Sequence, residues 1–349
     1  MKKLLSICIP TYNRIDDLSE IVDAILTIDN FDFEIVITDN LSTDTTKEKI
    51  LSYSDPRVRY CLNDEALPPF LNMIHSIFNA DGKYALYCND RDILYPDGII
   101  KLMKVLKDND FAFLYSPAAT KSATNSFSIF ESGFDSLMNF ACIHHPTGMV
   151  YNRELISQYL TEDDYNNYLQ YINTYDFLML DLFKYGKSIC YSGNYWSPRA
   201  AEYIKKNKSG TIQSNKKLYF SPEVREHMFY GIVEHIFIRN DYNLTDDKKL
   251  KLLKKVYFEF CFLFCKYKAC MADANETTHY GIKTKHISTI HILKIFTSFL
   301  NRSFDFLLKR DFDFSLINYA KKQRCNLYFQ IVKNCIKIDL IQLKKRLIK

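Results

Sequence analysis

The chain has 349 residues, of which 47% are hydrophobic and 25% charged, enough for one large or two medium domains with true cores. Glycine and proline number 9 each, against 26 phenylalanines and 25 tyrosines, which excludes a disordered or low-complexity chain. The ten cysteines are scattered without a CxxC pair, which indicates buried free thiols in a reducing compartment and not a zinc site.

Charge is distributed unevenly along the chain. From Thr245 to the C-terminus there are 22 basic and 9 acidic residues, a net charge of +13, whereas the remainder has 24 against 32, a net charge of −8. Two regions of opposite electrostatic character are therefore predicted. No stretch approaches the roughly 18 uninterrupted apolar residues that a membrane span needs, so we expect a cytoplasmic protein.

Apolar runs alternate with helical patterns along the first 116 residues. This alternation is typical of a parallel sheet covered on both faces. We therefore expect an α/β fold with a Rossmann-type, mostly parallel sheet and helices on both faces. Strands are predicted at 4–9, 33–38, 57–61, 83–88 and 111–116, and helices at 16–27, 42–53, 68–80 and 96–107, the second of them capped by Ser42 or Thr43.

The rest of the chain changes in character after about residue 117. Residues 205–217 are polar and basic, as in a linker, and the chain beyond them has apolar residues at helical spacing. We therefore predict a catalytic domain over 1–204 with two halves, 1–120 and 121–204, followed by the linker and a mainly helical region over 218–349.

Polar clusters follow four of the predicted strands, at the edge where ligands bind in open sheets of this kind. Side chains of these types can bind a nucleotide or a metal. The clusters are Thr11-Tyr12-Asn13-Arg14, Asp39-Asn40, Asn63-Asp64-Glu65 and Asn89-Asp90-Arg91-Asp92.

The last cluster has the spacing of a metal site. The chain has neither a GxGxxG nor a GxxxxGK[ST] loop, so a bound diphosphate would be neutralised by a metal, and Mn²⁺ or Mg²⁺ prefers oxygen ligands. In extended geometry Asp90 and Asp92 point the same way, and Arg91 points elsewhere. The alternative for this segment is a solvated surface turn.

Three segments taken together resemble the inverting family 2 glycosyltransferases of the GT-A fold. They are "SICIPTYNR", "FEIVITDNLSTDTT" and "ADGKYALYCNDRDILYPDGI", and the resemblance covers about residues 1–120. Similar members build bacterial capsule, O-antigen or other surface glycans. The resemblance implies a metal-dependent inverting transfer from a nucleotide sugar, first of all a UDP-sugar, to a glycan or polyprenyl-linked saccharide acceptor.

The resemblance also implies roles for single residues in the first half. Asp39 would accept a hydrogen bond from the uracil ring edge, and Arg91, in place of an acid, would face the donor sugar. Alternatively, Asp39 is a turn carboxylate and Asn72 is structural. The nucleotide site would comprise Pro10, Thr11, Tyr12, Arg14, Asp39, Asn40, Asn72 and Asp90, and the metal ligands would be Asp92 and Asp90.

The acceptor half should supply the base that takes the proton of the acceptor hydroxyl. The family's usual window points to Asp176, with Asp181 as the alternative base or an ordinary surface charge. His145 would orient the acceptor or approach the metal, unless it is a plain loop histidine. Trp196 would stack on a sugar ring, unless it packs in the core.

Three hypotheses account for the basic C-terminal helices. They form a cap over the acceptor site or a homodimer interface, or they bind the anionic inner face of the plasma membrane, since Lys344, Lys345, Arg346 and Lys349 flank apolar residues. Nucleic-acid binding is not expected, because no recognised motif accompanies the charge.

Two other functions remain open at this point. A nucleotidyltransferase that makes sugar nucleotides has a related fold but opens with a Gly-rich basic loop, which "PTYNR" lacks. A catalytically inactive relative that serves as a membrane-associated assembly partner is the second alternative. Its support is Arg91, together with Asp176, which lies one position beyond the place where the family's usual acidic pair would fall.

Overall fold

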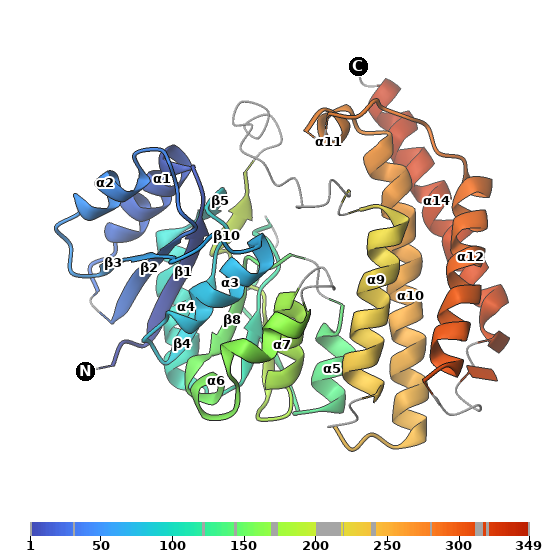
Figure 1. Cartoon of the computed structure of the whole chain (residues 1–349), viewed down its shortest axis with the longest axis horizontal. Helices are drawn as coiled ribbons and strands as arrows, with labels where there is room; N and C mark the ends of the chain where they lie inside the picture. Colours follow the sequence, from blue (N-terminus) through green and yellow to red (C-terminus); the bar gives the residue numbers. More distant parts are fainter. Residues whose placement is uncertain are drawn as a thin grey trace. The chain divides into compact units, whose positions relative to one another are not determined.

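A computed structural model of the chain forms two compact units, Met1–Ala200 and Ala201–Lys349 (Figure 1). The expected linker at 205–217 lies outside the described residues. The structure describes residues 2–30, 32–120, 123–142, 145–168, 174–199, 218, 220–238, 242–279, 281–310, 317–318 and 321–347.

The first unit is built on an eight-stranded sheet with strand order β3-β2-β1-β4-β8-β6-β9-β7. β1, β2 and β4 are buried along almost their whole length, which means that both faces of the sheet are covered. The strands of this sheet are β1 (Leu5–Thr11), β2 (Phe33–Asp39), β3 (Val58–Leu62), β4 (Tyr84–Tyr87), β6 (Phe113–Tyr115), β7 (Phe127–Phe130), β8 (Met149–Asn152) and β9 (Ser188–Tyr191). A separate antiparallel pair joins β5 (Asp92–Leu94) to β10 (Trp196–Pro198).

Helices pack on this sheet through apolar stripes. In the first helix the buried residues Leu18, Ile21, Val22 and Ile25 recur at helical spacing and join the core of β1 and β2. α3 packs against β1, β2 and β4 and also against α7. The helices are α1 (Ile15–Leu26), α2 (Thr46–Leu51), α3 (Pro69–Phe78), α4 (Pro96–Asp108), α5 (Phe134–Phe140), α6 (Arg153–Tyr159), the 3₁₀-helix η1 (Glu162–Tyr168) and α7 (Thr174–Leu182).

The expected α/β fold is confirmed, with two differences in detail. Among the described strands, β8 runs antiparallel to both β4 and β6, and β7 runs antiparallel to β9. The cap expected from Ser42 or Thr43 is wrong, because Ser42 Oγ accepts from the Asn13 N–H instead (2.9 Å) and α2 begins at Thr46.

The second unit is helical around an aromatic core. The ring centroid of Phe229 lies 4.8 Å from that of Tyr257, 5.3 Å from that of Phe260 and 5.0 Å from that of Phe299. No helix in the described part of the chain is both long and apolar enough to span a bilayer. The elements are α9 (Pro222–Val233), the π-helix η2 (Glu234–Ile238), α10 (Asp246–Met271), α11 (Ala274–His279), α12 (Thr289–Leu308) and α14 (Arg324–Leu347).

Candidate active site

The polar clusters after β1, β2 and β4 meet at one edge of the sheet. The three strands are parallel neighbours, and the register pairs Thr11 with Asp39. The Thr11 hydroxyl donates to Asp90 Oδ2 (3.0 Å) and so joins the segment after β1 to that after β4. This edge therefore brings together the first, second and fourth of the clusters predicted from the sequence, and the third joins them through Asn63, whose N–H donates to the Asp39 carbonyl (3.0 Å).

The acidic segment after β4 is a tight turn. The Asp92 N–H donates to the Asn89 carbonyl (3.1 Å), which closes a four-residue turn with Asp90 and Arg91 at its centre. The expected extended geometry is therefore wrong, and so is the argument that alternation directs Arg91 away from its neighbours. Arg91 is half-buried, and its positive charge is among the influences that lower the pKa of Asp90.

Asp92 is fixed by a buried hydrogen-bond cluster. Its Oδ2 accepts from the Thr147 hydroxyl (2.5 Å) and from Asn89 Nδ2 (2.9 Å). The backbone N–H of Asn89 donates in turn to Thr147 Oγ1 (3.1 Å). His145 Nε2 lies 3.9 Å from the same carboxylate oxygen. Because charge-assisted hydrogen bonds are directional, this cluster sets the orientation of the carboxylate.

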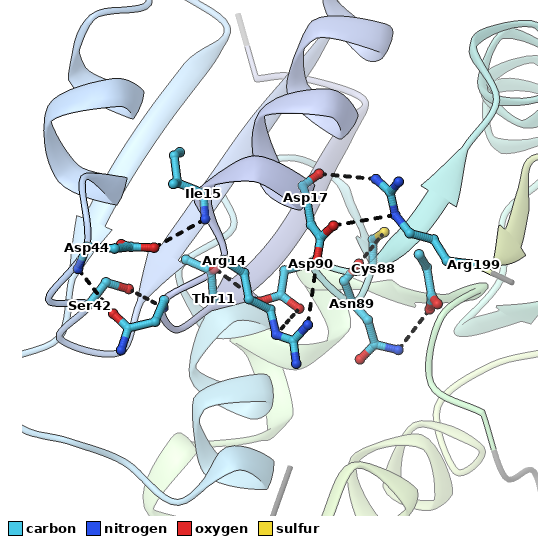
Figure 2. A network of polar contacts seen from close by, with 12 residues as sticks. Thr11, Arg14, Ile15, Asp17, Ser42, Asp44, Cys88, Asn89, Asp90 and Arg199 are labelled. Carbon is cyan, nitrogen blue, oxygen red and sulfur yellow. Dashed lines mark hydrogen bonds and ion pairs between the residues drawn. The ribbon is translucent and has the colours of Figure 1, made fainter. Parts of the chain in front are cut away.

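Asp90 is held differently, at the end of a chain of alternating charges (Figure 2). Arg14 Nε lies 3.7 Å from Asp90 Oδ1, and Arg14 Nη1 lies 3.6 Å from the Asp17 carboxylate. Arg199 approaches Asp17 from the other side (3.9 Å) and pairs with Glu20 (2.6 Å). This chain ties the end of the first unit to the start of α1.

Burial dominates the protonation of Asp90. It raises the pKa of Asp90 to about 6, against the opposing effects of the Arg14 charge and the Thr11 hydrogen bond. The charged form of Asp90 is favoured by any further positive charge beside it, and a bound cation is one such charge.

Asp39 is buried beside the loop between β2 and α2. Its Oδ1 accepts from the Ser42 N–H (2.8 Å) and its Oδ2 from the Tyr60 hydroxyl (2.7 Å). This is the turn carboxylate that the sequence left as an alternative. Each carboxylate oxygen has a second lone pair, so these bonds leave room for one further donor on each oxygen.

Asn40 and Asn72 hold a loop in place. Asn63 Nδ2 donates to both Asn40 Oδ1 (2.9 Å) and Asn72 Oδ1 (2.8 Å). Asn40 also exchanges hydrogen bonds with the backbone of Leu67 (2.9 and 2.8 Å). The structural alternative for Asn72 therefore has direct support, and Asn40 has the same role.

The segment after β1 presents its side chains in two directions. Pro10 is half-buried within β1, whereas the ring of Tyr12 is 49% exposed at the rim of the site. Asn13 has a positive φ of 54°, and its Oδ1 accepts from the Thr43 N–H (2.7 Å). The turn therefore binds the following loop, and Tyr12 stays exposed to solvent.

Trp196 packs in the core. It is only 2% exposed, its Nε1 donates to the Ser116 carbonyl (2.8 Å), and its ring stacks on His145 at 4.7 Å. The expected stacking of Trp196 on a sugar is therefore wrong, and the core-packing alternative holds. Gly148, with a φ of +96°, is required here because a Cβ would lie 2.3 Å from Trp196 Nε1.

The two candidate bases have different surroundings in α7. Asp181 accepts from the Tyr165 hydroxyl (3.1 Å) and from Lys184 (3.1 Å). These two bonds are consistent with a structural role for this carboxylate. Asp176 is buried in the first turn of the helix. Burial, and to a smaller degree the charge of Asp176, raises the pKa of Tyr151 in β8 well above its usual value.

Sequence reasoning missed Thr147, Asp17 and Arg199 as parts of the site, and it gave Asn89 no role of its own within its cluster. Thr147, Asp17 and Arg199 carry no local signal, because only the packing of distant segments brings them to the carboxylates.

Comparison with known proteins agrees with this geometry. Residues 6–160 match the model of glycosyl transferase family 2. This part of the chain belongs to that family. The matched segment thus contains the carboxylates of Asp90 and Asp92, and it also contains Asp39 and Thr147.

The curated relatives share this segment. The chain is 38% identical over 109 residues to the abequosyltransferase RfbV of Salmonella typhimurium, covering 30% of this chain and 32% of that protein. It is 24% identical over 112 residues to the Escherichia coli enzyme WfgD, covering 32% of this chain and 44% of that one. WfgD is a UDP-Glc:alpha-D-GlcNAc-diphosphoundecaprenol beta-1,3-glucosyltransferase. The chain thus spans less than half the length of these two relatives.

A solved structure resembles the chain over nearly its whole length. The match to residues 1–349 of S. aureus TarS covers 99% of this chain and 92% of that one, with a TM-score of 0.57 and 14% identity. TarS has also been solved with UDP and with UDP-GlcNAc. At this identity the likeness shows the fold alone, an α/β unit followed by helices.

Proposed function

We propose that the chain is a metal-dependent inverting glycosyltransferase. It transfers a sugar from a UDP-sugar to a glycan or lipid-linked saccharide in the synthesis of a bacterial surface glycan. The observation that carries the proposal is the joining of Thr11 to Asp90 beside Asp92, at the strand ends of a family 2 domain. The named relatives support the substrate classes, because WfgD uses UDP-Glc and a diphosphoundecaprenol acceptor.

The donor would lie along the carboxyl ends of β1, β2 and β4. We assign the uracil ring edge to the remaining acceptor capacity of Asp39, and the nucleoside to the segment from Pro10 to Arg14 with Tyr12 at its rim. Arg14 would bind a diphosphate oxygen, and Arg91 would lie on the sugar side. Asn40 and Asn72 would act by holding the loop that borders this pocket.

The carboxylates of Asp90 and Asp92 fit a hard divalent cation. Their donors are all oxygens, which Mg²⁺ and Mn²⁺ prefer, and such ions often take one or two carboxylates together with substrate phosphates. Within the described residues no group of three or more His, Cys, Asp or Glu could hold a metal, so the donor diphosphate would complete the shell. When bound, the cation supplies positive charge beside the diphosphate leaving group.

The chemical step is a single displacement. The acceptor hydroxyl attacks the anomeric carbon, the bond to the diphosphate breaks, and UDP leaves with the bonding electrons. We propose that Asp176 takes the proton of the attacking hydroxyl, since Asp181 already accepts from Tyr165 and Lys184. His145, beside Asp92, would orient the acceptor.

The acceptor class bears on where the reaction takes place. A polyprenyl-linked saccharide is anchored in a bilayer, so we propose that the enzyme meets it at the cytoplasmic face of the plasma membrane. The basic helices of the second unit would contact this surface.

Hydrolysis and transfer assays with a panel of UDP-sugars test the proposal. We expect Mn²⁺-dependent hydrolysis of one donor, lost in Asp92→Asn and retained in Asp108→Asn, whose exposed carboxylate lies at the end of α4. Asp39→Asn should weaken stabilisation by UDP with or without metal. Absence of both nucleotide binding and hydrolysis would contradict the proposal and favour the inactive assembly partner.

Two further measurements separate the remaining alternatives. Release of pyrophosphate from a nucleoside triphosphate and a sugar 1-phosphate would identify a nucleotidyltransferase instead. Asp176→Asn should lower kcat by about 10²-fold or more with little change in the donor KM, whereas Asp181→Asn should mainly lower stability.

A further inference from the structure

Helix α14 has two faces of different character. On one face Leu327, Ile331 and Cys335 are fully buried, and the helix packs there against α10 and α12 (Figure 1). The other face is open to solvent. A surface helix of a water-soluble domain normally carries polar residues on that side.

The open face of α14 carries large apolar side chains. Phe329 is 67% exposed, Ile336 52%, Leu340 61% and Leu343 54%. With about 100° of rotation per residue, these four lie within about 60° of one another around the helix axis. They form a continuous apolar stripe, and single scattered exposed residues would not be aligned in this way.

A row of lysines borders the stripe. Lys333, Lys337 and Lys344 are exposed, and helical spacing places them along one side of it. The only acidic residue between Arg324 and Lys344 is Asp339, and its carboxylate pairs with the buried Lys268 (2.7 Å). From Arg324 to Lys344 the open face of α14 is thus apolar and cationic.

This charge pattern decides between two occupants. Packing the face against the same face of an antiparallel second copy would bring the two lysine rows together, and like charges repel. An anionic bilayer accepts both parts at once, since acyl chains take up the apolar stripe and lipid phosphates pair with the lysines.

We infer that α14 lies flat on an anionic lipid surface, with Phe329, Ile336, Leu340 and Leu343 inserted and Lys333, Lys337 and Lys344 at the headgroups. This inference deepens the membrane contact in the proposed function and defines its face. It does not depend on turnover, because binding to lipid is measured without a sugar donor.

Vesicle flotation of the full chain tests the inference. We expect binding to vesicles of phosphatidylglycerol and phosphatidylcholine in equal parts, and little binding to phosphatidylcholine alone. The variant F329S/I336S/L340S/L343S should bind at least about tenfold more weakly, because it removes the apolar contribution. The variant K333E/K337E/K344E should lose the preference for the anionic lipid and its sensitivity to salt.

Matched variants on the first unit control for general effects. L51S/I100S/I129S replaces exposed apolar residues there, and K101E/K104E/K107E makes the same charge change on α4, so both should bind vesicles as the wild type does. Circular dichroism and UDP-sugar hydrolysis in solution should be unchanged by the α14 variants. Wild-type protein that bound anionic vesicles but hydrolysed no donor would contradict the catalytic assignment and not this face.

Three results would overturn the inference. The first is wild-type protein that does not bind, or that binds neutral and anionic vesicles equally. The second is unchanged binding by both α14 variants. The third is a fall in molar mass of the serine variant in light scattering, which would show that a second copy covers the stripe.

Discussion

Replacing Thr147 by valine should loosen the carboxylate of Asp92. Valine keeps the shape of threonine but lacks the hydroxyl, which donates to Asp92 Oδ2 at 2.5 Å and accepts from Asn89. A hydrogen bond to a charged group contributes about 1.5–3 kcal/mol, and a buried donor left without an acceptor costs about 1–3 kcal/mol. Allowing for partial relaxation, Thr147→Val should lower the free energy of unfolding by about 2–4 kcal/mol.

The assay uses the chain's only tryptophan. Trp196 lies in the first unit, buried beside Gly148, so its fluorescence during urea unfolding reports on the unit that holds the site. Thr147→Ser keeps the hydroxyl and should retain most of the stability. The same pair should differ in function, with Thr147→Val losing Mn²⁺-dependent stabilisation by UDP.

A clear result would refute this reasoning. If Thr147→Val unfolds at the wild-type urea concentration and keeps metal-dependent nucleotide binding, the hydroxyl does not position Asp92. If serine and valine variants are equally destabilised, the lost methyl packing and not the hydrogen bond is responsible.

Four further substitutions have expected outcomes in the same unfolding assay. Gly148→Ala should lower the free energy of unfolding by more than about 2 kcal/mol, because Gly148 has a φ of +96° and the Trp196 ring lies where the new Cβ would be. Gly133→Ala should lower it by only about 1 kcal/mol, because Gly133 has a φ of +71° but no atom lies within 4 Å of the new Cβ. The hydrogen bond to Glu162 raises the pKa of His75, so this pair stabilises the fold fully below pH 6.5. Raising the pH through the shifted value should remove up to about 1 kcal/mol, and His75→Gln should abolish this pH dependence. Arg57→Met should lower the free energy of unfolding by about 2–4 kcal/mol, since it removes three hydrogen bonds to backbone carbonyls. A decrease below about 1 kcal/mol would contradict this expectation.

The sequence was sufficient for the first half of the sheet. The runs around β1, β2 and β4 are mostly apolar, which is the pattern of strands buried on both faces, and the helices between the first strands have apolar residues at helical spacing. Because β1, β2 and β4 are parallel neighbours, the polar residues that follow them lie at one edge of the sheet. For this reason the sequence alone predicts that Thr11, Asp39, Asp90 and Asp92 lie close together at that edge, and the register and contacts of these strands agree.

The antiparallel strands could not be predicted in the same way. β7 and β8 have four residues each, and β7 is exposed along three of them, so neither length nor periodicity distinguishes them from loops. The prediction of an extended segment at 89–92 was wrong for a similar reason. The residue types at 89–92 are compatible with a tight turn and with an extended segment. Only the hydrogen bond from the Asp92 N–H to the Asn89 carbonyl shows that the turn is formed.

Local sequence thus determined which segments form strands and helices and which carboxylates stand at the strand ends, because hydrophobic periodicity acts within a few residues. Tertiary structure alone decided what surrounds those carboxylates. Thr147 reaches Asp92 across 55 residues, and Arg199 reaches Asp17 across 182, through packing that no local pattern records. The same applies to Trp196, whose burial against Gly148 and His145 depends on segments that are remote from the first strands of the fold.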